Sequence, residues 1–266
     1  MNAEELLQAG RVEESLASLQ DAVRKNAADP RLRVFLFQTL SVLGQWKRAL
    51  NQLDVLANMG SDQMMLARIF QPVVQCELLR EQVFAGKHTP IVFGEPEPWM
   101  SWLVQANELV AQEKFGPARE LREKAFEAAP ASAGKINDQP FEWIADADSR
   151  LGPMLEAVVE GRYYWIPFCR VKLIHLEPPA DLRDLVWMPV QFVWTNGGEM
   201  SGHVPVRYPA TEKTNDDPLR LARKTEWIEC PEGWSLGRGQ RILGTDGGDY
   251  PLLECRKIEL TPGSGA

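Results

Sequence analysis

The chain has few of the residues that bind metal ions or form disulfides. It contains four cysteines and three histidines among 266 residues. The cysteines lie far apart and form no C-x-x-C pair, which excludes the usual zinc and redox motifs. The histidines have no neighbouring ligand pattern. We therefore predict no metal and no cofactor, and we expect reduced, partly buried thiols of the kind found in cytoplasmic proteins.

Long apolar runs and an excess of positive charge are also lacking. No apolar run reaches the roughly 18 residues of a candidate transmembrane helix. The N-terminal stretch MNAEELLQAGRVEES is acidic, whereas a secretory signal begins with a basic flank. The net charge is −8 and the pI is about 5.1, which argues against nucleic-acid phosphates and anionic membranes as partners. We expect a cytoplasmic protein with no membrane and no nucleic-acid partner.

Catalytic motifs are missing as well. The chain has no G-x-S-x-G, H-E-x-x-H or G-K-[ST] sequence. The stretch GRGQRILG, residues 237–244, has Ile242 where a dinucleotide-binding fingerprint has its third glycine, and we interpret it as a turn. The sequence therefore favours a protein that is not an enzyme.

What the chain does contain is a repeat. The pattern Gly-x-apolar-x-x-small-x-x-x-Leu at 10–19 returns at 44–53, displaced by 34 residues. A third copy begins at Phe115, with Ala118 at the small position. A period of 34 with a small residue where two helices touch is the tetratricopeptide (TPR) pattern. Such helical pairs stack and leave a curved surface that commonly holds a peptide or helix of another protein.

The second half differs in composition. Six of the nine tryptophans lie beyond residue 137, among short β-rich runs such as LVWMPVQFVW and HVPVRY. Asn196-Gly197 predicts a hairpin turn, and the segment 246–249 predicts a second turn. The frequent prolines suggest short strands of a small barrel. We predict an α+β protein: a TPR-like α-α superhelix over 1–133, a β-rich, barrel-like domain over 134–260 and a disordered tail over 261–266.

The helical part offers a candidate partner-binding surface. In stacked pairs the first helix of each pair lines the concave face, which has the apolar and amide composition that suits an amphipathic helix. The predicted partner-binding residues are Val34, Gln38, Ser41, Val42, Arg68, Gln71, Gln75, Met100, Leu103, Asn107 and Val110.

A second candidate is the segment FEWIADADSRLGP, residues 141–153. Asp146 and Asp148 could hold a cation, but Arg150 stands where a calcium loop needs a third acid. The alternative is that these carboxylates accept backbone hydrogen bonds or pair with Arg150. We keep Trp143, Asp146, Asp148 and Arg150 as secondary candidates for a ligand or partner site.

This segment, together with GEPEPWMSWL, RDLVWMPVQF and GQRILGTD, resembles the ImpE/SciE/TagJ family of type VI secretion accessory proteins. The resemblance extends from Asn2 to about Leu260. It implies a cytoplasmic, non-enzymatic adaptor that associates with the small subunit of the contractile sheath and with the ClpV-type AAA+ ATPase that disassembles it. The alternative is a ligand-binding or enzymatic domain in the tryptophan-rich half, with the repeats as a docking module.

Overall fold

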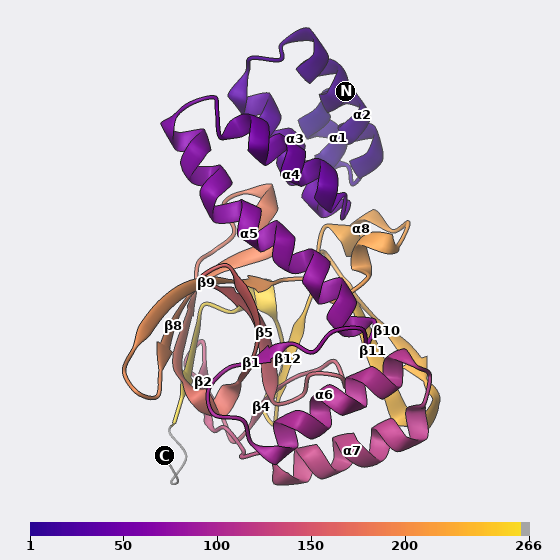
Figure 1. Ribbon diagram of the computed structural model, residues 1–266, viewed down its shortest axis with the longest axis vertical. Coiled ribbons are helices and arrows are strands. Elements are labelled where there is room, and N and C mark those ends of the chain that lie inside the picture. Colours follow the sequence, from indigo (N-terminus) through magenta and orange to yellow (C-terminus); the bar gives the residue numbers. More distant parts are fainter. Residues whose placement is uncertain (262–266) are drawn as a thin grey trace.

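The computed structural model describes residues 1–261, and the expected disorder of the tail falls almost wholly outside them. Helices occupy most of the first half and strands most of the second, as predicted (Figure 1). The helices are α1 (Ala3–Gln8), α2 (Val12–Lys25), α3 (Pro30–Val42), α4 (Trp46–Leu56), α5 (Ser61–Phe84), α6 (Pro98–Ala111), α7 (Phe115–Ala128) and the short α8 (Asp217–Arg220).

Local sequence signals set the ends of the first helices. Asn2 and Glu5 form a capping box at the start of α1, and the Asp29 side chain caps α3. Gly10 and Gly44 follow α1 and α3 with φ of 72° and 64°, a backbone conformation that favours glycine. The repeat therefore marks real helix boundaries.

Helix α5 contains a proline. A proline inside a helix commonly kinks or ends it, but α5 continues through Pro72 as one helix from Ser61 to Phe84. Eight of its side chains are buried, including Phe70, Val73 and Val74. Because this packing favours one continuous helix, it offsets the backbone hydrogen bond that proline removes.

The strands form one large sheet and two small ones. The large sheet has the order β1-β6-β5-β9-β8-β7-β14-β2-β3. Its strands are β1 (Ile91–Val92), β2 (Gly134–Ile136), β3 (Gln139–Phe141), β5 (Met154–Val159), β6 (Arg162–Pro167), β7 (Val171–Leu176), β8 (Trp187–Trp194), β9 (Glu199–Pro205) and β14 (Lys257–Leu260). The small sheets are β10 (Thr225–Cys230) with β11 (Trp234–Gly239), and β4 (Ile144–Asp146), β12 (Ile242–Thr245) and β13 (Gly248–Pro251).

The strand pairing confirms the turns but not the barrel. Asn196-Gly197 joins β8 to β9 in an antiparallel hairpin, and Asp246-Gly247, within the predicted turn at 246–249, joins β12 to β13. Among the described residues β1 and β3 remain at the two edges of the large sheet, so the sheet is open rather than a closed barrel. The extended loop after α5 contributes β1, which runs parallel to β6.

The helical and β-rich parts share a core. Trp187 of β8 lies among helical aromatic rings, with ring centroids 5.9 Å from Trp46, 5.9 Å from Phe70 and 6.5 Å from Phe37. Its indole Nε1 donates a 2.8 Å hydrogen bond to Glu77 of α5. Buried residues of both halves thus belong to one apolar cluster. The division at residue 133 stays a prediction.

Arg207 also joins the two parts. Its guanidinium is buried and donates to the carbonyl oxygens of Val42, at 2.7 Å, and Ser41, at 3.3 Å. A cation at this position stabilises α3, because the C-terminal end of a helix carries partial negative charge. Within the described residues, no helix is long and apolar enough to cross a membrane.

The fully buried Ala49 of α4 provides a test of the helical packing. Ala49→Leu adds three carbon atoms to a closed interior, and we expect it to lower the free energy of unfolding by roughly 1–3 kcal/mol. Urea unfolding measures the change. Val55→Leu, at a position of the same helix that is 40% exposed, is the control and should alter stability by less than about 0.5 kcal/mol. Equal stability of both variants would contradict the packing.

Candidate functional site

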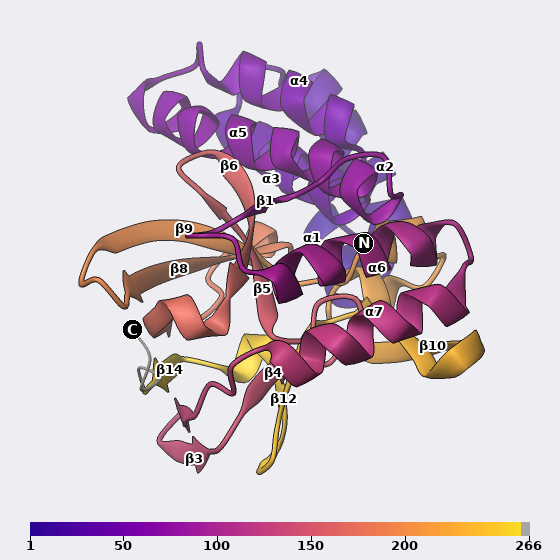
Figure 2. The same ribbon diagram turned by 60° about the horizontal axis from the view of Figure 1, so that its bottom comes forward.

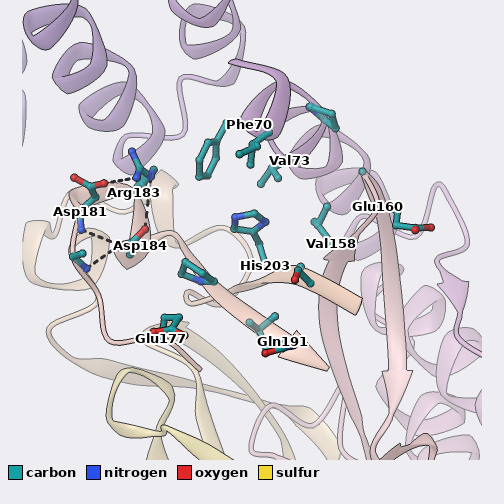
Figure 3. A pocket seen from close by; sticks show the side chains of 18 of the residues that line it. Phe70, Val73, Val158, Glu160, Glu177, Asp181, Arg183, Asp184, Gln191 and His203 are labelled. Carbon is teal, nitrogen blue, oxygen red and sulfur yellow. Dashed lines mark hydrogen bonds and ion pairs between the residues drawn. The ribbon is translucent and has the colours of Figure 1, made fainter. Parts of the chain in front are cut away.

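A hollow of about 1050 Å³ lies between α5 and the face of the large sheet (Figure 3). Its walls come from α5, the turn between β5 and β6, the segment after β7, and strands β8 and β9. A hollow of this size between two rigid elements is a typical place for a ligand or a partner side-chain cluster.

The floor of this hollow is apolar. Phe70 and Val73 of α5 and Val158 of β5 line it and are buried. Ile69 also lines it but is 46% exposed, and Met65, one turn earlier on α5, is 65% exposed. Exposed large apolar side chains beside a hollow commonly mark an interaction site.

A fixed polar turn forms one wall. Arg183 forms ion pairs with Asp181 and Asp184, and its guanidinium lies 5.1 Å from the centroid of the Phe70 ring. Asp184 is buried and accepts hydrogen bonds from the backbone N–H groups of Ala180, at 2.9 Å, and Asp181, at 2.8 Å. These contacts hold the segment before β8 in one conformation against α5.

His203 of β9 points into the hollow from the sheet (Figure 3). Its ring centroid is 5.2 Å from that of Phe70. Burial lowers the pKa of His203, Asp184 partly opposes this effect and Arg183 adds to it, and together they bring the pKa to about 4. The imidazole is therefore neutral at pH 7 and contributes to an uncharged floor.

A second hollow of about 400 Å³ adjoins the first at Asp181, which lines both. It is lined mainly by α3, together with one residue each from α1, α5 and the segment before β8. Its residues are Glu4, Pro30, Arg31, Leu32, Val34, Phe35, Gln38, Gln63 and Asp181. We call the two hollows together the α5 groove.

The α5 groove contains three of the predicted partner-binding residues. Val34 and Gln38 line the smaller hollow, and Arg68 lines the larger one. Gln71 and Gln75 belong to α5 but line neither hollow. Gln75 is exposed, and Gln71 donates a 2.7 Å hydrogen bond to Asp54.

The expectation of one concave face extending to α6 is not met. Six predicted residues are buried inside the chain and line no groove: Ser41, Val42, Met100, Leu103, Asn107 and Val110. Asn107, for instance, donates a 2.9 Å hydrogen bond to the Val83 carbonyl. For the four residues of α6 the physical reason is that α6 and α7 lie at the other end of α5 from α3 and α4 (Figures 1 and 2). There the apolar positions of α6 pack within the protein.

The secondary candidates are also mostly internal. Asp146, Asp148 and Arg150 are buried, whereas Trp143 is 44% exposed. Asp148 accepts from Arg150 Nε at 2.8 Å and from the Gly237 N–H at 2.8 Å. This agrees with the alternative in which the carboxylate satisfies backbone groups and its neighbouring arginine. No cluster of three acidic, histidine or cysteine side chains suited to a metal occurs in residues 1–261.

Asp146 belongs to a buried network of ion pairs that we did not predict from the sequence. It pairs with Arg241, which also pairs with Glu156 of β5. Arg80 of α5 donates to both oxygens of Glu156, at 2.6 and 3.0 Å, and Tyr163 donates a further hydrogen bond. Burial by itself raises the pKa of Glu156, but the Arg80 and Arg241 guanidinium groups hold it at about 2.

Sequence reasoning missed most of the larger hollow, including Phe70, Val73, Glu160, Arg183 and His203. The segment Asp181-Leu182-Arg183-Asp184 carries one usable signal, since two acids three residues apart form a capping pattern. Nothing in the sequence pattern places this turn beside α5.

Comparison with known proteins gives consistent results. The family model described as ImpE protein matches residues 138–259. The type VI secretion system accessory component TagJ of Pseudomonas aeruginosa is 44% identical over 262 residues, covering 98% of this chain and 92% of the relative. A crystal structure of protein VPA1032 from Vibrio parahaemolyticus shares the fold, with a TM-score of 0.89 over 97% of each chain and 24% identity.

Removing the central carboxylate of the ion network should destabilise the protein. In Glu156→Gln the buried Arg80 and Arg241 lose a counter-charge, and we expect a loss of roughly 3–5 kcal/mol in the free energy of unfolding. Chemical denaturation at neutral pH measures it. Glu160→Gln, an exposed acid four residues later, serves as the control. An unchanged unfolding midpoint in Glu156→Gln would show that the network does not stabilise the fold.

The lowered pKa of His203 predicts a pH dependence of stability. The unfolded histidine takes up a proton near pH 6.5 and the folded one only near pH 4. The unfolded state therefore binds more protons between these values, so stability falls by up to about 3 kcal/mol as pH drops through this window. In His203→Gln that part of the slope should vanish in urea titrations at a series of pH values. Identical pH profiles for both proteins would refute the assignment.

Proposed function

The chain belongs to the ImpE family, and on this premise we propose that it is a non-enzymatic cytoplasmic adaptor of a bacterial type VI secretion system. The relative named as an accessory component of that system aligns over nearly the whole of both chains. The α5 groove, a hollow with an apolar floor between two rigid elements, is the observation on which the proposal of a binding role rests.

We propose that the partner is a helical segment of the small sheath subunit. An amphipathic helix is about 10 Å wide and presents apolar side chains at i, i+3, i+4 and i+7. The α5 groove offers Phe70 and Val73 as an apolar floor and Ile69 as an exposed contact. Val34, Gln38 and Arg68 stay in this proposal as partner-binding residues.

We further propose that the chain links the sheath subunit to the ClpV-type ATPase. The family resemblance supports this second partner. In this proposal residues 1–133 act as a TPR-like docking part that lines the smaller hollow and supplies the α5 side of the larger one. Residues 134–260 supply the rest of the larger hollow, through β5, β8, β9 and the segments beside them. The surfaces outside the groove remain available for the second partner.

The exposed Ile69 provides the test. Ile69→Asp places a carboxylate among the apolar contacts of the bound helix, so we expect at least a tenfold weaker affinity for the small sheath subunit. Isothermal titration calorimetry with the purified subunit measures it, and circular dichroism checks that the variant is folded. Val55→Asp, on the exposed part of α4 and outside both hollows, is the matched control.

Two outcomes would contradict the proposal. The first is that wild-type protein does not bind the small sheath subunit. The second is that Ile69→Asp and Val55→Asp bind equally well, which would place the contact elsewhere. A small molecule retained by the purified protein in native mass spectrometry would instead favour the ligand-binding alternative.

A further inference from the structure

The rim of the α5 groove is acidic on two sides. Glu160, in the turn between β5 and β6, and Glu177, after β7, line the larger hollow, and both are exposed. They extend from different parts of its wall (Figure 3). The β5–β6 turn that carries Glu160 packs against α5, because a Cβ at Gly161 would lie only 3.0 Å from Pro72. The backbone that carries this carboxylate is therefore held beside the apolar floor.

The positive charges of the groove do not neutralise this rim. Five carboxylates line the two hollows against three guanidinium groups: Glu4, Glu160, Glu177, Asp181 and Asp184 against Arg31, Arg68 and Arg183. Arg183 is already paired with Asp181 and Asp184. Neither Arg31 nor Arg68 forms an ion pair with Glu160 or Glu177 in the described structure. Glu177 does contact His175, with 3.5 Å between Nε2 and the carboxylate, and this contact is an ion pair only when the imidazole is protonated. The groove thus presents a negative rim around an uncharged floor.

We propose that the α5 groove selects a basic amphipathic helix, with apolar side chains on the floor and lysine or arginine side chains directed to Glu160 and Glu177. This inference rests on the proposed function and adds the charge of the partner segment to it. Opposite charges across an interface steer the encounter and fix the register of the bound helix. Because both carboxylates are exposed, their effect depends on ionic strength.

The experiment compares two charge-reversed double variants of the full chain. Glu160→Lys/Glu177→Lys changes the rim of the groove. Glu120→Lys/Glu127→Lys makes the same change in net charge at two exposed positions of α7, which line neither hollow. Affinity for the purified small sheath subunit is measured by calorimetry at low and at high salt, and circular dichroism confirms that each variant is folded.

We expect the rim variant to bind at least tenfold more weakly at low salt, with a smaller difference at high salt. The α7 variant should bind within about twofold of wild type. A rim variant with wild-type affinity, or equal weakening of both variants, overturns the selection of a basic helix while the proposed function stands. Failure of the wild-type chain to bind overturns both.

Discussion

Glu156 is the residue on which the arrangement of this protein depends. Its carboxylate is fully buried and can stay ionised there because Arg80, Arg241 and Tyr163 all donate to it. Arg80 comes from α5, and Arg241 comes from the segment that leads into β12. A buried charge is costly unless its partners are present, so α5, β5 and the β12 region have to assemble together. This requirement sets the position of α5 on the sheet.

The α5 groove follows from that position. Arg80, near the C-terminal end of α5, joins the ion network, and Phe70, earlier in the helix, packs against Trp187. Phe70 and Val73 also line the hollow between α5 and the face of the sheet, and Ile69 beside them stays accessible. The same helix therefore joins the helical part to the β-rich part and forms the wall of the candidate binding site. Both parts of the chain contribute residues to the groove, and they share one core.

The sequence predicted the features that depend on near neighbours. The repeat located the ends of α1 and α3 at Gly10 and Gly44, and Asn196-Gly197 located the β8–β9 hairpin. It could not predict contacts between distant residues. Asp146 and Arg241 are 95 positions apart, and Glu156 and Arg80 are 76 apart. No local pattern shows which arginine neutralises which acid. The α6 residues were misplaced because the repeat gives the apolar face of a helix but not the partner that covers it.

The claim that the α5 groove binds the partner is tested most directly by amide hydrogen exchange of the full chain with and without the small sheath subunit. Exchange reports local opening segment by segment, and a bound partner slows it at the contact. The account predicts slower exchange in the first half of α5, in the segment 177–184 and in β9, with little change in α7 and the β10–β11 hairpin. Protection confined to α7 or to that hairpin, with α5 unchanged, would contradict it.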